Sequence, residues 1–341
     1  MNDRKAVPRA ADLASLVRAP AALSVPGDVL VGATAAGRPL GLRTAGVMAS
    51  SVCLYWAGMA LNDYADAAVD SVERPQRPIP SGRVPRRTAL SVATGLTAAG
   101  LGLATLSGGR RGLAAALPLT VLVWAYDLKL KSTPAGPAAM AGARVLDVLA
   151  GAVAGGGRTP PPASGGGAGT ASDGTARALG RAAVPALLTG LHTYTLTLLS
   201  RHEISGAPAR LPAATLAVSS ATAVASAWPS RRSAPRGTAD GNAPGTPVGT
   251  TPATAVAGTT PATATAVAAA LAYLGTYGRA QALAVRDPRG GPVRRAVGAG
   301  ILAMVPLQAA LTARGGAPGA AAVLGAVHPL ALRLARRVSP T

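Results

Sequence analysis

Apolar segments long enough to cross a membrane follow one another along most of the chain, and charged residues separate them. A helix of about 20 apolar residues spans a bilayer. The pattern therefore predicts an all-α integral membrane protein, a bundle of about nine transmembrane helices with a range of about eight to ten. The expected spans are 21–37, 44–62, 88–107, 112–126, 137–155, 181–199, 211–228, 264–283 and 294–313, with a weaker tenth at 318–335.

Two segments between these spans have low complexity. Residues 156–180 are rich in Gly, Pro and Ser, and residues 229–263 are rich in Pro, Thr and Ala. Both contain too few bulky apolar side chains to form a core of their own. We therefore expect two flexible loop insertions within a single transmembrane domain that covers residues 1–341.

Composition and charge support a membrane protein. Charged residues make up 13% of the chain, against about 25% in soluble domains, so an ordinary soluble enzyme is excluded. Cys53 is the only cysteine, which excludes a disulfide-rich scaffold. The net charge of +20 comes from arginines in short loops between apolar segments, not from one basic stripe. This placement favours membrane lipid as a partner and excludes nucleic acid.

The basic residues also predict an orientation. The polar first residues, Met1 to Ala11, lack the pattern of a signal peptide, so we expect the first span to stay as an anchor. Lysine and arginine are more frequent in the loops on the N-terminal side of the bundle, which we expect to face the cytoplasm from the plasma membrane. These loops cover residues 62–87, 127–136, 200–210 and 284–293.

Four acids and an amide lie close together at the end of the second expected span. At about 100° per residue they share one face of a helix. They are Asn62, Asp63, Asp66, Asp70 and Glu73. Crowded carboxylates repel one another near a bilayer and need cations, and oxygen ligands of this kind suit Mg²⁺ together with a phosphate-bearing substrate. The alternative is a salt-bridged helix end.

A proline-rich loop with arginines follows the acidic cluster. Guanidinium groups bind phosphate oxygens through paired hydrogen bonds, and the prolines stiffen the loop that carries Arg77. We therefore expect Arg77 to contact phosphate, whereas Arg86 and Arg87 fit a solvated loop that follows the positive-inside rule.

The stretch from Asn62 to Gly82, NDYADAAVDSVERPQRPIPSG, closely resembles the first signature of the UbiA-type intramembrane prenyltransferases. The resemblance implies a UbiA-like domain over residues 1–341, with helices around a central cavity that faces lipid. It also implies a prenyl diphosphate bound through Mg²⁺. By the family's pattern, Asn62, Asp63, Asp66 and Asp70 would hold the metal and the diphosphate, and Arg77 would contact phosphate.

A second stretch, from Tyr126 to Pro134, is similar to the family's Tyr/Lys loop, which closes over the diphosphate. The resemblance implies that Tyr126, Lys129 and Lys131 belong to this site, with the lysines as phosphate contacts; interfacial snorkelling is the alternative. Arg144 and Asp147 lie inside the next apolar span. They either pair with each other at i and i+3 or belong to the site.

The chain departs from the family after the sixth expected span. Prenyl-transferring members usually carry a second acidic motif there for a second metal ion, whereas this chain has one acid, Glu203, beside His202. We expect Glu203 to ligate a second Mg²⁺. This variant looks like the EboC-like branch of the family.

The resemblance thus implies a Mg²⁺-dependent membrane transferase that moves a prenyl group from a prenyl diphosphate to a small or lipid acceptor. Asp63, Asp66, Lys129 and Glu203 would be catalytic, and Asn62, Arg77, Tyr126, Lys131 and Arg144 would bind the substrate. Because the second acidic motif is reduced, two alternatives stay open. One is a non-catalytic lipid- or diphosphate-binding or transport-assisting protein, and the other is transfer of a phosphorylated sugar to a lipid phosphate. Acceptor, prenyl length and oligomeric state are not specified by the sequence.

Overall fold

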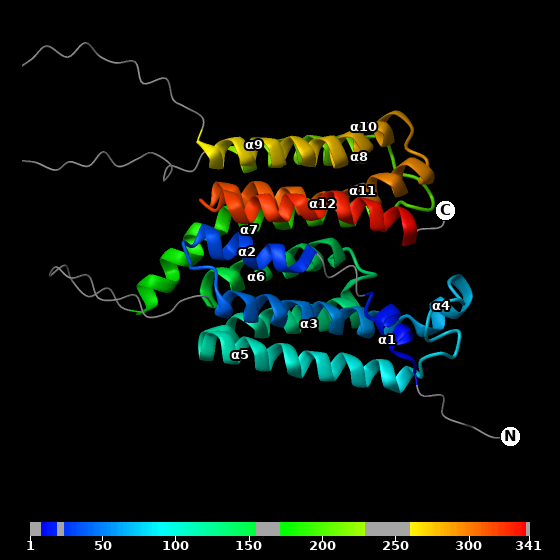
Figure 1. Cartoon of the computed structure of the whole chain (residues 1–341). Coiled ribbons are helices and arrows are strands. Elements are labelled where there is room, and N and C mark those ends of the chain that lie inside the picture. The colour runs from blue at the N-terminus through cyan, green and yellow to red at the C-terminus, as the bar shows by residue number, and fades with distance from the viewer. Residues whose placement is uncertain (1–7, 19–23, 155–170, 229–259, 339–341) are drawn as a thin grey trace, which may run out of the picture.

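The computed structural model describes residues 8–18, 24–154, 171–228 and 260–338, and these residues form helices and connecting turns (Figure 1). The first half contains α1 (Ala10–Leu16), α2 (Val25–Ala35), α3 (Leu42–Ala65), α4 (Ala67–Glu73), α5 (Arg86–Ala125), the π-helical turn η2 (Tyr126–Leu130) and α6 (Gly136–Ala154). The second half contains α7 (Ala171–Ser200), α8 (Arg210–Ala227), α9 (Pro261–Tyr273), the π-helical turn η3 (Leu274–Gly278), α10 (Arg279–Arg286), α11 (Gly290–Arg314) and α12 (Pro318–Val338). The all-helical prediction is confirmed.

The range of α5 contains two of the expected spans, 88–107 and 112–126. Gly109, with φ of 59° and ψ of −145°, interrupts the helix between them. On the far side of this turn, Trp124 Nε1 donates a hydrogen bond to Thr97 Oγ1 at 3.1 Å. A straight helix would hold these two residues about 40 Å apart, so α5 is a hairpin of two helices that pack against each other.

Five helical segments are long and apolar enough to cross a membrane, while α2 is apolar but shorter. The five segments are Leu42–Ala65, Arg86–Leu130, Gly136–Val153, Asp173–Ser200 and Gly290–Arg314. The chain is therefore a multi-pass membrane protein. The expected number of nine crossings stays a prediction.

The low-complexity segments lie largely outside the described residues, at 155–170 and 229–259. The expected boundary of the first insertion was wrong at its C-terminal end. Residues 171–180 are helical because α7 begins at Ala171, and charged residues such as Asp173 and Arg177 extend the helix beyond its apolar part. The helix α9 likewise begins at Pro261, and its N-cap, Thr260, accepts a hydrogen bond from the backbone of Thr263.

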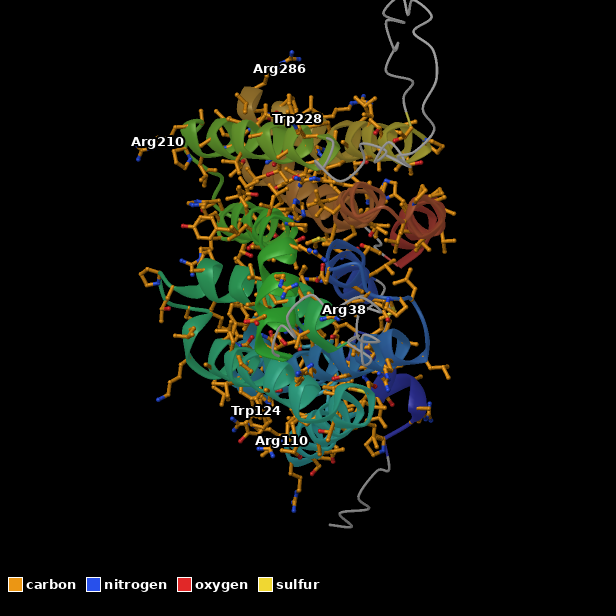
Figure 2. All side chains as sticks on the ribbon, turned by 90° about the vertical axis from the view of Figure 1, so that its left-hand side faces the viewer. Arg38, Arg110, Trp124, Arg210, Trp228 and Arg286 are labelled. Atoms are coloured by element: carbon orange, nitrogen blue, oxygen red, sulfur yellow. The ribbon has the colours of Figure 1, made fainter. Side chains whose placement is uncertain are left out.

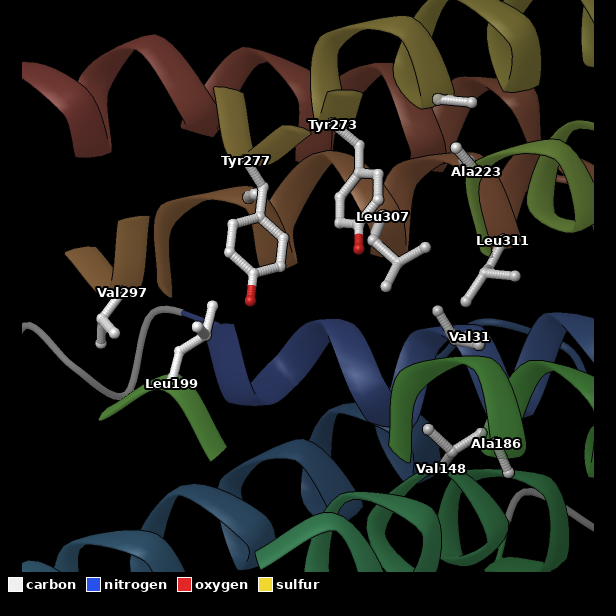
Figure 3. Close-up of a cluster of buried hydrophobic side chains, with 13 residues drawn as sticks. Val31, Val148, Ala186, Leu199, Ala223, Tyr273, Tyr277, Val297, Leu307 and Leu311 are labelled. Atoms are coloured by element: carbon white, nitrogen blue, oxygen red, sulfur yellow. The ribbon is translucent and has the colours of Figure 1, made fainter. Parts of the chain in front are cut away.

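The helix α11 lies at the centre of the bundle, between the layer that contains α9 and the layer that contains α2 and α7 (Figure 1). Its side chains Leu307 and Leu311 join a buried cluster with Val31 of α2 and Val148 of α6 (Figure 3). At the periphery, Arg110, Arg210 and Arg286 point outward in a view along the helices (Figure 2). The apolar interior and charged exterior match the positions of the apolar spans in the sequence.

A histidine with two tyrosines fills part of this core. His192 Nδ1 lies 3.0 Å from Tyr273 Oη, and its Nε2 lies 3.2 Å from the carbonyl oxygen of Gly300. The rings of His192, Tyr273 and Tyr277 pack edge to face, with centroids 5.2–6.1 Å apart. His192 is therefore a packing residue of this core.

Candidate functional site

A cavity of about 540 Å³ opens between α3, α6, α7 and α11. Most of its wall is apolar, with Met59, Leu196 and Met304 among the lining side chains. Polar side chains line it in two places. One group stands near the C-terminal end of α3, and the other surrounds Arg144 of α6.

The acidic cluster sits at a break between two helices. The helix α3 ends at Ala65 and α4 begins at Ala67, with Asp66 as the residue between them. Asp63 and Asp70 are each 3% exposed, whereas Glu73 is exposed to solvent. The expectation that all five side chains share one helix face was therefore wrong for Glu73, because the break redirects the helix that carries it.

Arg77 lies between the two buried carboxylates. Its Nη1 atom is 2.5 Å from Asp70 Oδ2 and 3.4 Å from Asp63 Oδ1. Asp63 Oδ1 also accepts a hydrogen bond from Arg18 Nη2 at 2.9 Å. Two guanidinium groups from distant parts of the chain thus compensate these carboxylates, and one of them, that of Arg18, lines the cavity.

The segment after α5 supplies the other side of the site. Lys131 Nζ lies 2.5 Å from Asp66 Oδ1, and Asn62 Nδ2 donates a hydrogen bond to Asp127 Oδ1 at 3.2 Å. Tyr126 and Asp127 both line the cavity. Lys129 is exposed, and no ion pair or hydrogen bond joins it to the cluster within the described ranges. The structure therefore places Lys131 in the site, and it does not place Lys129 there.

Four loops that the charge pattern assigns to one face lie at the same end of the bundle. The Asp66–Lys131 ion pair joins the first two. Arg201 Nη2 donates to the carbonyl oxygens of Lys131 and Thr133, which joins the third. The backbone N–H of Ala207 donates to the carbonyl oxygen of Pro288 at 2.9 Å, which joins the fourth. The four loops therefore share one end of the bundle, and the expectation that this end faces the cytoplasm stays a prediction.

Arg144 does not form its main ion pair with Asp147. Its Nη1 donates to Asp28 Oδ2 at 2.6 Å, and its Nη2 donates to Ser24 Oγ at 3.2 Å. Asp147 instead accepts a hydrogen bond from Ser51. Of the two alternatives for these residues, the i,i+3 pair is wrong, because α2 and α3 pack beside α6 and supply nearer partners.

Glu203 lines the cavity from the loop after α7. Burial raises the pKa of its carboxyl group above the usual range, and the positive charges of Arg294 and Arg74 partly oppose this rise. Among the residues that the structure describes, no three His, Cys, Asp or Glu side chains converge as a metal centre. Arginine and lysine side chains stand against the carboxylates in this conformation.

Residues 25–228 match the UbiA prenyltransferase family. The chain belongs to this family. The matched residues include the acidic cluster, Lys131, Arg144 and Glu203, whereas α9 to α12 lie beyond them.

The family's archaeal members include relatives of this chain. It is 48% identical over 108 residues to the digeranylgeranylglyceryl phosphate synthase of Methanopyrus kandleri, covering 31% of this chain and 39% of that protein. It is 39% identical over 118 residues to the synthase of the same name from Ignicoccus hospitalis, covering 35% and 38%. The matches thus span about two fifths of the length of these curated relatives.

Solved structures of UbiA proteins share the fold. One, described as providing insights into digeranylgeranylglyceryl phosphate synthase in membranes, superposes with a TM-score of 0.57, 15% identity, and coverage of 89% of this chain and 98% of that one. The apo UbiA homologue of Aeropyrum pernix K1 also gives 0.57, with 17% identity and coverage of 85% and 96%. None of these matches specifically supports the EboC-like branch, which stays a prediction.

Three residues in or beside this site are not predicted as site residues by the sequence patterns. Arg18 precedes the first apolar span, a position that by itself indicates only a positive-inside arginine. Asp127 stands inside the Tyr/Lys loop, and Asp28 is an acid within an otherwise apolar span. An acid within an apolar segment needs a cationic or polar partner. This requirement alone indicates that Asp28 pairs with another side chain inside the bundle.

Proposed function

We propose that this chain is a Mg²⁺-dependent intramembrane prenyltransferase that moves a prenyl group from a prenyl diphosphate to an acceptor. One observation carries the proposal. Carboxylates and cations gather beside a largely apolar cavity in a UbiA fold. Arg18, Asn62 and Asp127 line the cavity, and Asp63 pairs with Arg18 next to it. The charged groups can bind a diphosphate, and the apolar wall of the cavity can hold a prenyl chain.

The acidic side chains fit Mg²⁺ by their donor chemistry. Asp63, Asp66 and Asp70 each use one carboxylate oxygen in ion pairs, and the second oxygen of each makes no hydrogen bond within the described part of the chain. Hard oxygen donors of this kind are the ligands that Mg²⁺ prefers. We propose that these carboxylates, with Asn62, hold the ion. When bound, Mg²⁺ would supply Lewis-acid neutralisation of the departing diphosphate.

The cations of the chain itself would bind the diphosphate. Arg18, Arg77 and Lys131 each contact a carboxylate of the cluster. A metal ion that took over those carboxylates would let the three cations turn toward phosphate oxygens. Arg201 would keep the Lys131 segment in place through the carbonyl groups that it contacts.

The apolar wall would protect the reaction from water. When the bond between the allylic carbon and the diphosphate oxygen breaks, the electron pair leaves with the diphosphate. Side chains such as Val123 and Leu196 offer no nucleophile to the remaining carbon. Water exclusion then lets the acceptor form the new bond and lose its proton. The names of the archaeal relatives support a glycerophosphate-type acceptor.

We also propose that the site faces the cytoplasm from the plasma membrane, which the basic residues of the four loops support. A single cysteine placed at Glu73, in a Cys53→Ser background, should react with a membrane-impermeant reagent only from the cytoplasmic side. A cysteine placed at Arg110, in the turn of the α5 hairpin, should react from the other side. The reverse pattern would contradict this orientation.

The activity is tested with the full chain in lipid nanodiscs, radiolabelled geranylgeranyl diphosphate and geranylgeranylglyceryl phosphate. We expect Mg²⁺-dependent binding and transfer. Asp63→Asn should weaken Mg²⁺-dependent binding by about 100-fold or more, the scale of several lost charge-assisted contacts. Glu73→Gln, which changes an exposed acid beside the cluster, is the matched control and should bind normally.

The same experiment separates the alternatives. Binding without transfer to any glyceryl or aromatic acceptor would favour the non-catalytic binding protein. Absence of Mg²⁺-dependent binding by a folded wild-type protein would overturn the proposed function.

A further inference from the structure

A second polar surface lies inside the cavity, away from the acidic cluster. Tyr55 and Trp56 of α3 and Arg144 of α6 all line the cavity. Tyr55 Oη and Trp56 Nε1 are buried and make no hydrogen bond within the described residues. The guanidinium carbon of Arg144 lies 4.9 Å from the centroid of the Tyr55 ring. We call these three residues the donor wall.

Two unpaired donors in one cavity need an explanation, because a buried N–H or O–H group without a partner is costly. Trp56 Nε1 can only donate, and a tyrosine hydroxyl donates readily. A ligand oxygen placed in the cavity would satisfy them. The neighbouring lining side chains Met59, Met140 and Ala143 are apolar and cannot do so.

The charge of Arg144 would at first suggest an anionic ligand. Asp28, fully buried behind the cavity lining, already pairs with this guanidinium group at 2.6 Å. Gln308 Nε2 donates to the other oxygen of Asp28 at 2.7 Å, which holds the carboxylate in place. Asp147, one helical turn from Arg144, is a second fully buried acid nearby. The carboxylate of Asp28 thus balances the positive charge of Arg144, and Asp147 adds a second acid nearby. An anionic ligand therefore gains little net electrostatic attraction at the donor wall.

We propose that the donor wall binds an uncharged oxygen group of the acceptor, a hydroxyl, ether or carbonyl, while anionic groups stay beside the cations that contact the acidic cluster. This inference rests on the proposed function. It assigns the part of the cavity around Arg144 to recognition of the acceptor and makes Tyr55 and Trp56 specificity-determining residues.

The spacing along α3 supports this division. Tyr55 precedes Asp63 by eight residues, which is about 12 Å along a helix. An acceptor that contacts the donor wall would therefore extend from the wall toward the reacting carbon beside the diphosphate. A glyceryl ether, with several uncharged oxygens on a short backbone, meets this requirement.

The test uses two probes that share an octyl ether and differ in their head group. One is 3-octyloxypropane-1,2-diol, which is neutral, and the other is 3-octyloxypropanoate, which is an anion. Binding of each to the full chain in nanodiscs is measured by equilibrium dialysis against empty nanodiscs. We expect the neutral diol to bind at least about tenfold more tightly than the carboxylate after subtraction of lipid partitioning.

Two variants that keep an aromatic side chain but remove the donor test the assigned contacts. Tyr55→Phe and Trp56→Phe should each weaken binding of the diol by about three- to tenfold, the scale of one hydrogen bond. Tyr194→Phe and Trp228→Phe change exposed side chains and are the matched controls, for which we expect the wild-type affinity. Thermal unfolding of all four variants shows whether each is folded.

Tighter binding of the carboxylate would overturn the assignment to an uncharged group. Unchanged diol affinity in both folded wall variants, or no diol binding by wild-type protein, would overturn the donor wall as its site. Geranylgeranyl diphosphate binding is measured in parallel. If that binding fails while the diol still depends on Tyr55 and Trp56, the proposed function fails and the donor wall stands. If only the diol results fail, the inference alone is wrong.

Discussion

Lys131 Nζ lies 2.5 Å from Asp66 Oδ1, and this ion pair joins the segment after α5 to the junction between α3 and α4. The family's Tyr/Lys loop offers two lysines two residues apart. Only Lys131 reaches the acidic cluster among the contacts of the described residues, while Lys129 is exposed to solvent. The two lysines are therefore a natural pair for a test.

Replacing Lys131 by methionine should weaken binding of geranylgeranyl diphosphate about 10- to 100-fold, because a charge-assisted contact contributes about 1.5–3 kcal/mol. Lys129→Met removes the same charge two residues away and should change the affinity less than about threefold. Filter binding with radiolabelled diphosphate measures both. Equal losses in the two variants would show that both lysines reach the diphosphate in the bound state.

Arg77 compensates two carboxylates, and its removal should affect stability as well as binding. In Arg77→Gln, Asp70 loses its only ion-pair partner among the described residues. We expect a loss of about 1–3 kcal/mol, below the 3–5 kcal/mol of a fully buried pair because solvent reaches the site. Added Mg²⁺ should restore part of the loss by binding the freed carboxylates.

Thermal unfolding in detergent with and without Mg²⁺ measures this effect. Arg83→Gln is the matched control, because Arg83 pairs with Asp12 at 2.8 Å in a more exposed position. Exposed pairs contribute about 0–1 kcal/mol. If Mg²⁺ stabilised both variants equally, the acids beside Arg77 would not hold the ion.

The positions of the helices could be predicted because a bilayer requires long apolar segments with charges at their ends. The break at Asp66 could not. No Gly or Pro interrupts residues 62–73, and backbone hydrogen bonds of helical spacing continue on both sides, from Asp66 N to Asn62 O and from Asp70 N to Asp66 O. The change of direction comes from the backbone of Asp66 alone, with φ of −85° and ψ of 3°. An aspartate at this position does not by itself predict the end of a helix.

The residues of the site were predictable where a local motif contains them, as for Asn62, Asp63 and Arg77. Partners that come from helix packing were not. Arg144 pairs with Asp28, which is distant in the sequence, because α2 packs against α6. The π-helical turn η2 also shifts the register between Tyr126 and Lys131, so periodicity could not decide which lysine faces the cluster.

Two glycines explain the close approach of α2 and α6. A Cβ atom added to Gly151 would lie 2.8 Å from Val29 Cα, and one added to Gly32 would lie 2.8 Å from the carbonyl carbon of Val148. Small residues permit such contacts between membrane helices. Gly151→Ala should therefore destabilise the protein by about 1–3 kcal/mol and disturb the Arg144–Asp28 pair that spans the same two helices.

The matched control for this substitution is Gly95→Ala, because the position is helical and a Cβ there meets nothing within 4 Å. Gly95→Ala should leave the unfolding temperature unchanged or raise it slightly. A Gly151→Ala variant as stable as the wild type would mean that the two helices separate easily, and the wall around Arg144 would then be less rigid than the packing indicates.

Glu203 should show opposite effects on stability and on turnover. Burial raises the pKa of its carboxyl group in the folded protein, so the fold favours the protonated form. A raised pKa contributes stability below the unfolded pKa, and this contribution is lost as the pH rises through the folded pKa. Glu203→Gln is neutral at every pH, so its stability should exceed that of the wild type at pH 7 and approach it near pH 4.

Turnover should change in the other direction. If Glu203 acts on the diphosphate end of the substrate through a metal ion, Glu203→Gln should lower turnover about 100-fold, the scale of one preorganised charge-stabilising group, while diphosphate affinity falls less. Glu73→Gln should change neither quantity, because Glu73 is exposed. A Glu203→Gln variant with normal turnover would show that the charge of Glu203 is not needed for transfer. A variant more stable than the wild type at pH 7 but poorly active would identify Glu203 as a group kept charged for function at a cost to the fold.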